Sequence, residues 1–320
     1  MSVVDRLSRV RLGRFASATM LAIAIGVAVV LLARGGSSIL KQSAAIDVRL
    51  VILSFVIECS GLLIAVPVWR QILASYGIHQ PARNDLLIYC YSLLGTVLPG
   101  GIWSMMSRSV LYGERGISGV RVASASVVEA LATGIAATGV YAIASTLQPG
   151  MSLWQRPEIG FGSAFVALIL LHPRVFNGLV RRVWIWSKRA DEPISIGLRP
   201  GKLMGWIGLE VIVVLIGGLA LFILLASLVG VSDIVAIQVI TAWAAASAAG
   251  NLFFWLPGTF VLRDGALILA LSSSLPVSVA VLFAILARVW TIGSLLALAG
   301  LVWLVLDLPY RNRRPIPHRD

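Results

Sequence analysis

A set of ionisable side chains lies inside long apolar segments of this sequence, where a charge is expensive. A charged group at the centre of a bilayer costs roughly 2.5–3.5 kcal/mol even on lenient insertion scales. Such a group normally faces the interior of a helix bundle, has a partner there, and marks a functional pathway. The candidates are Glu58, Arg108, Glu129, Glu210, Arg263, Asp264 and Arg288.

The arginines suggest binding of phosphate, because a planar guanidinium matches two phosphate oxygens at once. Arg108 follows Pro99-Gly100 closely, so the start of a helix there would add free N–H donors for an anion. We interpret Arg108 as a phosphate-binding residue. The alternative is a structural ion pair, with Glu129 as its partner.

Glu129 and Arg288 occupy equivalent segments of the two halves with opposite charge. A bond between them would be either a fixed structural link or a gate that breaks and re-forms. Arg263 and Asp264 are adjacent in sequence, and adjacent residues on a helix do not face each other. We therefore expect each of these two to have a separate partner.

Glu58 and Glu210 each lie near the middle of an apolar segment. They are candidate sites where proton binding couples to transport, since a buried carboxyl group can bind and release a proton. The alternative is that each carboxyl group only accepts a hydrogen bond from a neighbouring group.

Two Leu-Pro-Gly motifs interrupt apolar runs, one in each half of the chain, at Leu98-Pro99-Gly100-Gly101 and Leu256-Pro257-Gly258. Proline removes a backbone donor and glycine tolerates any φ, so each motif predicts a helix break. Broken backbone at membrane depth is tolerated only where it is buried in protein or lines a cavity. Paired breaks of this kind indicate a transporter's binding site. We therefore predict Pro99, Gly100, Gly101, Pro257 and Gly258 as substrate-binding positions, together with the charged residues.

The elements that must position these residues are membrane helices, since the 320 residues are 58% hydrophobic and only 12% charged. We predict an all-α polytopic membrane protein, a single transmembrane domain over 1–320, with about six crossings and two re-entrant broken pairs. The pairs are Leu86–Leu98 with Ile102–Tyr112, and Val235–Leu256 with Phe260–Leu271. The crossings are Phe15–Leu32, Val48–Val68, Val122–Ala144, Gly160–Leu171, Gly205–Leu228 and Val277–Leu306.

The net charge of +12 is concentrated at both termini and in a basic loop at 173–202. This placement follows the positive-inside rule and predicts that both termini and the loop are cytoplasmic. No separate basic domain is present that would bind nucleic acid. Within the loop, Asn177–Lys188 mixes tryptophans with basic residues, which suits a helix at the bilayer surface as well as a solvated loop.

The spacing of the halves predicts an inverted-topology repeat, with 47–146 as the first repeat and 203–306 as the second. Glu129 lies 31 residues after Leu98, and Arg288 lies 32 residues after Leu256. On the predicted topology, the first broken pair enters from the cytoplasm and the second from outside.

The sequence contains no convincing catalytic or metal-binding constellation. The three histidines are scattered, and Cys59 and Cys90 lack metal-ligand spacing. Nucleotide-binding and metalloprotease motifs are missing as well. We therefore predict neither an enzyme nor a metal or other cofactor.

Leu98-Pro99-Gly100-Gly101 with Arg108, Gly116 and Glu129 resembles the first half of the flippase-like transmembrane region of lysylphosphatidylglycerol synthases. Pro257-Gly258, Arg263-Asp264-Gly265-Ala266-Leu267 and Arg288 resemble its second half, whose usual pattern is Pro-Gly-Gly-x-Gly-x-x-Glu-x-x-Leu. The resemblance covers roughly Phe15–Leu306. The chain departs from the pattern at Thr259, Val261 and Asp264, where Gly, Gly and Glu are common.

The resemblance implies movement of an anionic or aminoacylated phospholipid, or of a lipid-linked glycan, between leaflets of a bacterial inner membrane. Since only polar residues follow the last apolar segment, we expect a stand-alone member without the soluble synthase domain. The expected partners are membrane lipids with anionic or glycosylated headgroups; a cytosolic biosynthetic enzyme and a second copy of the chain are further candidates. The alternative function is an integral-membrane subunit or enzyme of lipid or glycolipid biosynthesis, such as hopanoid or aminoacyl-lipid synthesis.

Overall fold

The computed structural model describes residues 47–97, 102–148, 157–172, 174–175, 178, 200–227, 236–256, 259–273 and 275–307. This part of the chain is helical and contains no strand, as predicted. The predicted crossing Phe15–Leu32, the positions Pro99, Gly100, Gly101, Pro257 and Gly258, most of the basic loop at 173–202 and both termini lie outside the described residues.

Four described helices are long and apolar enough to cross a membrane. They are α2 (Val48–Ser75), α5 (Gly119–Thr146), α8 (Pro200–Ala226) and α11 (Val277–Val302), the last extended by a π-helical turn, η4 (Trp303–Asp307). A helix of 28 residues is about 42 Å long, more than the roughly 30 Å of a bilayer core. The protein is therefore membrane-spanning, and four predicted crossings are confirmed as helices.

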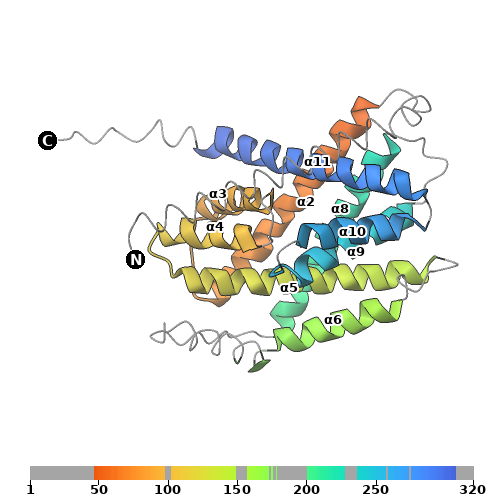
Figure 1. Ribbon diagram of the computed structural model, residues 1–320. Helices are drawn as coiled ribbons and strands as arrows, with labels where there is room; N and C mark the ends of the chain where they lie inside the picture. The colour runs from red at the N-terminus through yellow and green to blue at the C-terminus, as the bar shows by residue number, and fades with distance from the viewer. Residues whose placement is uncertain are drawn as a thin grey trace, which may run out of the picture.

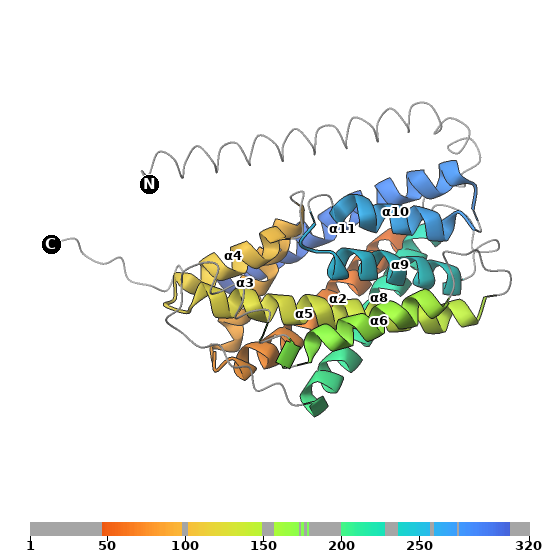
Figure 2. The same cartoon turned by 60° about the horizontal axis from the view of Figure 1, so that its bottom comes forward.

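The predicted crossing Gly160–Leu171 corresponds to the shorter helix α6 (Pro157–Leu171). Its 15 residues give a length of about 22 Å, less than the bilayer core. This helix packs along α5, as Figures 1 and 2 both show.

The two broken segments form two pairs of short helices. The first comprises α3 (Ala82–Leu93), the 3-10 turn η1 (Leu94–Val97) and α4 (Ile102–Gly113); the second comprises α9 (Ala236–Leu252) and α10 (Thr259–Leu271). Both α3 and α9 end several residues before the proline, earlier than predicted. The restriction that a proline places on the residue before it acts on that residue alone, so these earlier ends have an additional cause in the packing of the pairs.

The pairs lie at opposite ends of the bundle, α3 and α4 at one end and α9 and α10 at the other (Figures 1 and 2). At the first end, Arg83 near the start of α3 donates from Nη2 to the carbonyl of Leu306, 2.7 Å away, where α11 runs into η4. Trp206 of α8 donates to Gln71 of α2 over 3.2 Å at the same end.

Two further contacts define the opposite end. The amide of Asp47, before α2, donates to the carbonyl of Ser227, after α8, over 3.2 Å. Gln148, after α5, donates to the hydroxyl of Thr241 in α9 over 2.6 Å. The start of α9 therefore lies where α5 and α8 finish, whereas the start of α3 lies where α11 finishes.

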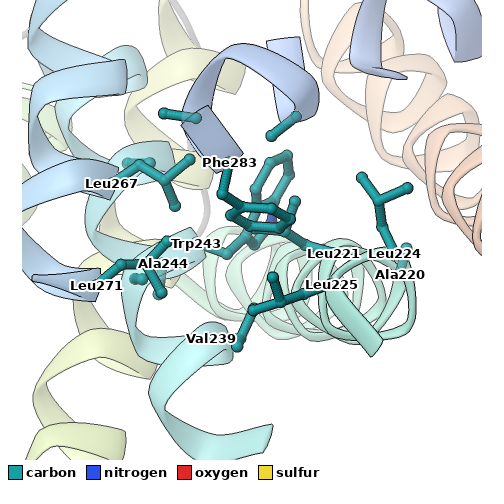
Figure 3. Packing of buried hydrophobic residues seen from close by; sticks show 14 of the residues in the cluster. Ala220, Leu221, Leu224, Leu225, Val239, Trp243, Ala244, Leu267, Leu271 and Phe283 are labelled. Atoms are coloured by element: carbon teal, nitrogen blue, oxygen red, sulfur yellow. The ribbon is translucent and has the colours of Figure 1, made fainter. Parts of the chain in front are cut away.

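Helix packing depends on a few small residues. Trp243 of α9 lies directly on Gly217 of α8, and Leu252 lies on Gly134 of α5, so a side chain at either glycine would collide. Figure 3 shows Trp243 with Phe283 in the middle of the second-half core, among leucines of α8 and α10.

Gly95 permits the closest backbone approach in the first broken pair. A Cβ atom at this position would lie 2.8 Å from backbone atoms of Trp103 and Ser104. Only glycine fits there, so η1 and the start of α4 are held against each other.

Candidate functional site

A partly open cavity of about 300 Å³ lies among the long helices and both broken pairs. Each of six helices contributes one ionisable side chain to its lining. These are Glu58 of α2, Arg108 of α4, Glu129 of α5, Glu210 of α8, Arg263 of α10 and Arg288 of α11. The structure thus brings together, in one place, all the charged candidates predicted from the sequence except Asp264, which binds Arg288.

Arg108 and Glu129 form a buried ion pair between α4 and α5. The guanidinium donates from Nη1 to Glu129 and from Nε to the hydroxyl of Ser92, 2.8 Å away. Only 5% of the Arg108 side chain is exposed. The structure therefore contains the ion pair with Glu129 that was the alternative interpretation of Arg108.

Two aromatic rings further restrict Arg108. Its Cζ lies 4.3 Å from the ring centre of Trp69 and 4.3 Å from that of Tyr89, so both rings contact the guanidinium. Cation–π contacts of this kind strengthen when they are shielded from water. Arg108 is fixed by contacts from three helices besides its own.

A hydrogen-bonded chain continues from this cluster towards the end of the bundle. Trp69 donates from Nε1 to the hydroxyl of Tyr112 over 3.0 Å, and Tyr112 donates to Asp85 over 2.8 Å. Asp85 also accepts from Nε of Arg70, 3.1 Å away. Because every member is satisfied, the network holds α2, α3 and α4 in one arrangement.

Arg288 and Asp264 form the corresponding pair of the second half, between α11 and α10. Arg288 donates from Nη2 to Asp264 over 2.8 Å and to the carbonyl of Phe260 over 3.3 Å. The two side chains remain 24% and 30% exposed. The bond considered between Glu129 and Arg288 is not formed, because each residue is bonded within its own half.

Arg263 occupies the cavity in a different way. Its Cζ lies 5.0 Å from the ring centre of Trp243, and its aliphatic part passes over Gly250 of α9. No hydrogen bond or ion pair joins its guanidinium to another described residue. Asp264 is bonded to Arg288, whereas the separate partner expected for Arg263 is not found among the described residues.

The carboxyl groups of the cavity are incompletely bonded. Glu210 accepts from the hydroxyl of Thr133 over 3.0 Å, while its other oxygen has no partner among the described residues. One oxygen of Glu129 is likewise without a partner there. Glu58 is buried, and Arg263 is the cation that acts on its charge.

Several residues of the site were not predicted from the sequence. Trp69, Tyr89 and Trp243 contact the arginines, and Asp85 and Tyr112 complete the network. Their only sequence signal is an aromatic or acidic residue in an apolar segment, which is also common in membrane helices without such a role.

The fold and the cavity define a polytopic helical membrane protein with a charged internal site. The family model described as "Lysylphosphatidylglycerol synthase TM region" matches residues 19–305, and the chain belongs to this family. The comparisons with curated proteins and with solved structures found no match. Membership associates the chain with the membrane part of lipid biosynthesis or translocation.

Proposed function

We propose that this protein moves lipid headgroups between the leaflets of a bacterial inner membrane. The observation that carries the proposal is the convergence of six ionisable side chains, from both halves, on one cavity among membrane helices. Charged groups within a membrane normally mark a pathway for a polar substrate. The cavity would take the headgroup while the acyl chains stay in lipid.

The size of the cavity fits this division of the substrate. About 300 Å³ lies at the lower end of the roughly 300–1,000 Å³ that small-molecule pockets occupy. That space suits a phosphate with a small polar group attached, and it is far too small for two acyl chains. The proposed substrate is therefore a phospholipid or lipid-linked glycan whose headgroup alone is buried.

The proposal assigns a role to each broken pair. We infer that both are re-entrant and belong to inverted repeats at 47–146 and 203–306, an arrangement that supports alternating access. Their location at opposite ends of the bundle supports this inference. Pro99, Gly100, Gly101, Pro257 and Gly258 would then flank the headgroup.

The basic residues support a cytoplasmic location for the end that carries α3 and α4. Arg70, Arg83, Arg115 and Arg121 belong to helices or turns at that end, and the positive-inside rule places such groups in the cytoplasm. Both termini and the loop at 173–202 would lie on the same side. There the loop could meet anionic lipid or a cytosolic biosynthetic enzyme.

The charged residues would share the work of binding and coupling. Arg263 and Arg288, the latter held by Asp264, form the proposed headgroup site, and the Arg108–Glu129 pair forms the wall beside it. Glu58 and Glu210 are the proposed proton-coupling residues, since each exposes a carboxyl group to the cavity.

The test is leaflet exchange of headgroup-labelled lipids in proteoliposomes that contain the purified protein. We expect faster exchange of phospholipids, and at least a several-fold loss in Ala130→Phe, because a phenyl ring would enter the cavity from α5. The matched control is Ile143→Phe on the same helix, where the side chain is 62% exposed.

Absence of exchange for every lipid, in vesicles where an established scramblase works, would contradict the proposal. The biosynthetic alternative would then be tested by product yield in cells that lack the protein. Equal loss in Ala130→Phe and Ile143→Phe would show that the cavity is not the pathway.

A further inference from the structure

Three guanidinium groups line the cavity, and two of them are already engaged by carboxylates of the protein. Arg108 is bonded to Glu129 and Ser92 and lies between two aromatic rings. Arg288 is bonded to Asp264 and to the carbonyl of Phe260. A substrate would have to break these bonds before it could use either group.

Arg263 is the exception among the described cavity residues. A guanidinium carries five N–H donors, and the Arg263 side chain is only partly buried, so donors without a protein partner can reach water or a ligand in the cavity. The described part of the chain offers these donors no hydrogen-bond acceptor or ion-pair partner within bonding distance. The side chain is nonetheless held in place, because Trp243 supports one face and Gly250 lies under its aliphatic part.

The contact with Trp243 does not use up the hydrogen-bond donors of Arg263. The Cζ atom lies 5.0 Å from the centre of the Trp243 ring, and the N–H donors, which lie in the guanidinium plane, have no partner among the described residues. Trp243 itself is fixed, since it lies on Gly217 and belongs to the core of the second half (Figure 3). A held guanidinium with available donors is suited to two oxygens of one tetrahedral anion.

Among the described cavity residues, the arginine without an ion-pair partner comes from the second half of the chain. Arg263 is the sixth residue after Pro257, and the sixth residue after Pro99 is Met105. Both positions line the cavity, so the halves present a guanidinium and a thioether to the same space. The anion should therefore bind on the side of α10 rather than midway between the halves.

Two carboxyl groups act electrostatically on Arg263, Asp264 more strongly than Glu58. Asp264 is bonded to Arg288, so it is already engaged by another arginine. Glu58 of α2 is buried, lines the same cavity, and forms no ion pair with Arg263. Glu58 is therefore the cavity carboxyl group that would compete with an anion for Arg263.

We propose that Arg263, supported by Trp243, binds the phosphate of the lipid headgroup, and that the carboxyl group of Glu58 in the same cavity opposes this binding. The inference rests on the proposed function for the identity of the ligand as a lipid. It is specific about the group recognised, because phospholipids and lipid-linked glycans share a phosphate. A lipid with a neutral sugar and no phosphate should not use Arg263.

The experiment measures lipid binding and exchange separately, so that failure of one does not hide the other. Binding of an anionic phospholipid to the purified protein is followed by native mass spectrometry, with a neutral glycosyl diacylglycerol as the second probe. We expect Arg263→Gln to weaken phospholipid binding at least about tenfold, because a charge-assisted bidentate contact is lost. Binding of the neutral lipid should change less than about twofold.

Further variants sharpen the result. Arg263→Lys should restore part of the binding, since it keeps the charge and loses the planar fork. Glu58→Gln should strengthen phospholipid binding, because the competing carboxylate is removed. Arg49→Gln, which removes an exposed arginine outside the cavity, is the control, and thermal unfolding confirms that each variant is folded.

The outcomes separate the two proposals. Selective loss of phospholipid binding in Arg263→Gln supports this inference even if the protein exchanges no lipid, which would contradict only the proposed function. Equal weakening of both lipids, or unchanged phospholipid binding in a folded variant, would overturn it. Competition by millimolar inorganic phosphate, with no retention of phospholipid, would assign Arg263 to a free anion and also overturn the lipid assignment.

Discussion

Two ion pairs at the cavity each join a short helix to the long helix that follows it in the chain, but they differ in how firmly they are held. Arg108 and Glu129 join α4 to α5 with side chains only 5% and 11% exposed, inside an aromatic and hydrogen-bonded network. Arg288 and Asp264 join α11 to α10, and their side chains are 24% and 30% exposed. The positions of the two charges are also reversed. The arginine is on the short helix in the first half and on the long helix in the second.

This difference suggests a division of labour. A buried, desolvated pair costs much to break, whereas a partly hydrated pair exchanges its partner for water or substrate at small cost. The first half therefore serves as the fixed wall of the cavity. The second half carries the more exposed ion pair and Arg263, which has no ion-pair partner among the described residues. We therefore expect substitutions in the second half to change substrate binding.

Arg108→Ala should produce the largest effect, on folding itself. Removing one partner of a buried pair leaves the other charge uncompensated, at a cost of about 3–5 kcal/mol. We expect a much reduced yield of folded protein and a lower unfolding temperature in detergent. Replacing both partners, Arg108→Met with Glu129→Leu, should recover most of the stability. A fully stable Arg108→Ala with altered exchange would instead show that Arg108 acts on the substrate.

Gly95→Ala should have the next largest effect on stability, and it tests the rigidity of the first broken pair. The added methyl group would lie 2.8 Å from the backbone of Trp103 and Ser104, so the pair must separate, at about 1–3 kcal/mol. The matched control is Gly265→Ala in α10, where an added Cβ meets nothing within 4 Å. That variant should be neutral or more stable by about 0.5–1 kcal/mol. Equal destabilisation of both variants would remove the proposed difference between the halves.

Arg288→Gln should separate stability from transport. Because the Arg288–Asp264 pair is partly exposed, its loss should change the free energy of unfolding by no more than about 1 kcal/mol. Lipid exchange should fall several-fold, since the accessible pair belongs to the proposed pathway. The reversed pair, Asp264→Arg with Arg288→Asp, tests whether the bond alone matters. Loss of folded protein in Arg288→Gln would mean that both pairs are structural.

Glu210→Gln should have the smallest effect on the fold. The amide oxygen can still accept from Thr133, and no ion pair is broken. Exchange without a pH gradient should be close to that of the unchanged protein, while acceleration by an imposed gradient should disappear. Thr133→Val, which removes only the hydroxyl, is the control. If acceleration by the gradient persists in Glu210→Gln, this residue is not the coupling site.

Much of the fold was predictable because membrane helices are signalled locally. The long apolar runs of α2, α5, α8 and α11 and the paired breaks are visible without any tertiary contact. The ends of the short helices were less accurate, since α3 and α9 finish before the residue that precedes proline. The loss of regular helix there depends on packing, such as the close approach at Gly95, as well as on the proline itself.

The sequence by itself determined that this is a membrane protein of its family and that its embedded charges must meet, because an isolated charge is not tolerated in hydrocarbon. Only the tertiary structure decided which charge meets which. Glu129 is bonded to a residue 21 positions away, and Arg288 to one 24 positions away, although a bond between Glu129 and Arg288 was equally consistent with their types. Helix rotation and depth make that choice, and they are properties of packing that residue types and spacing do not contain.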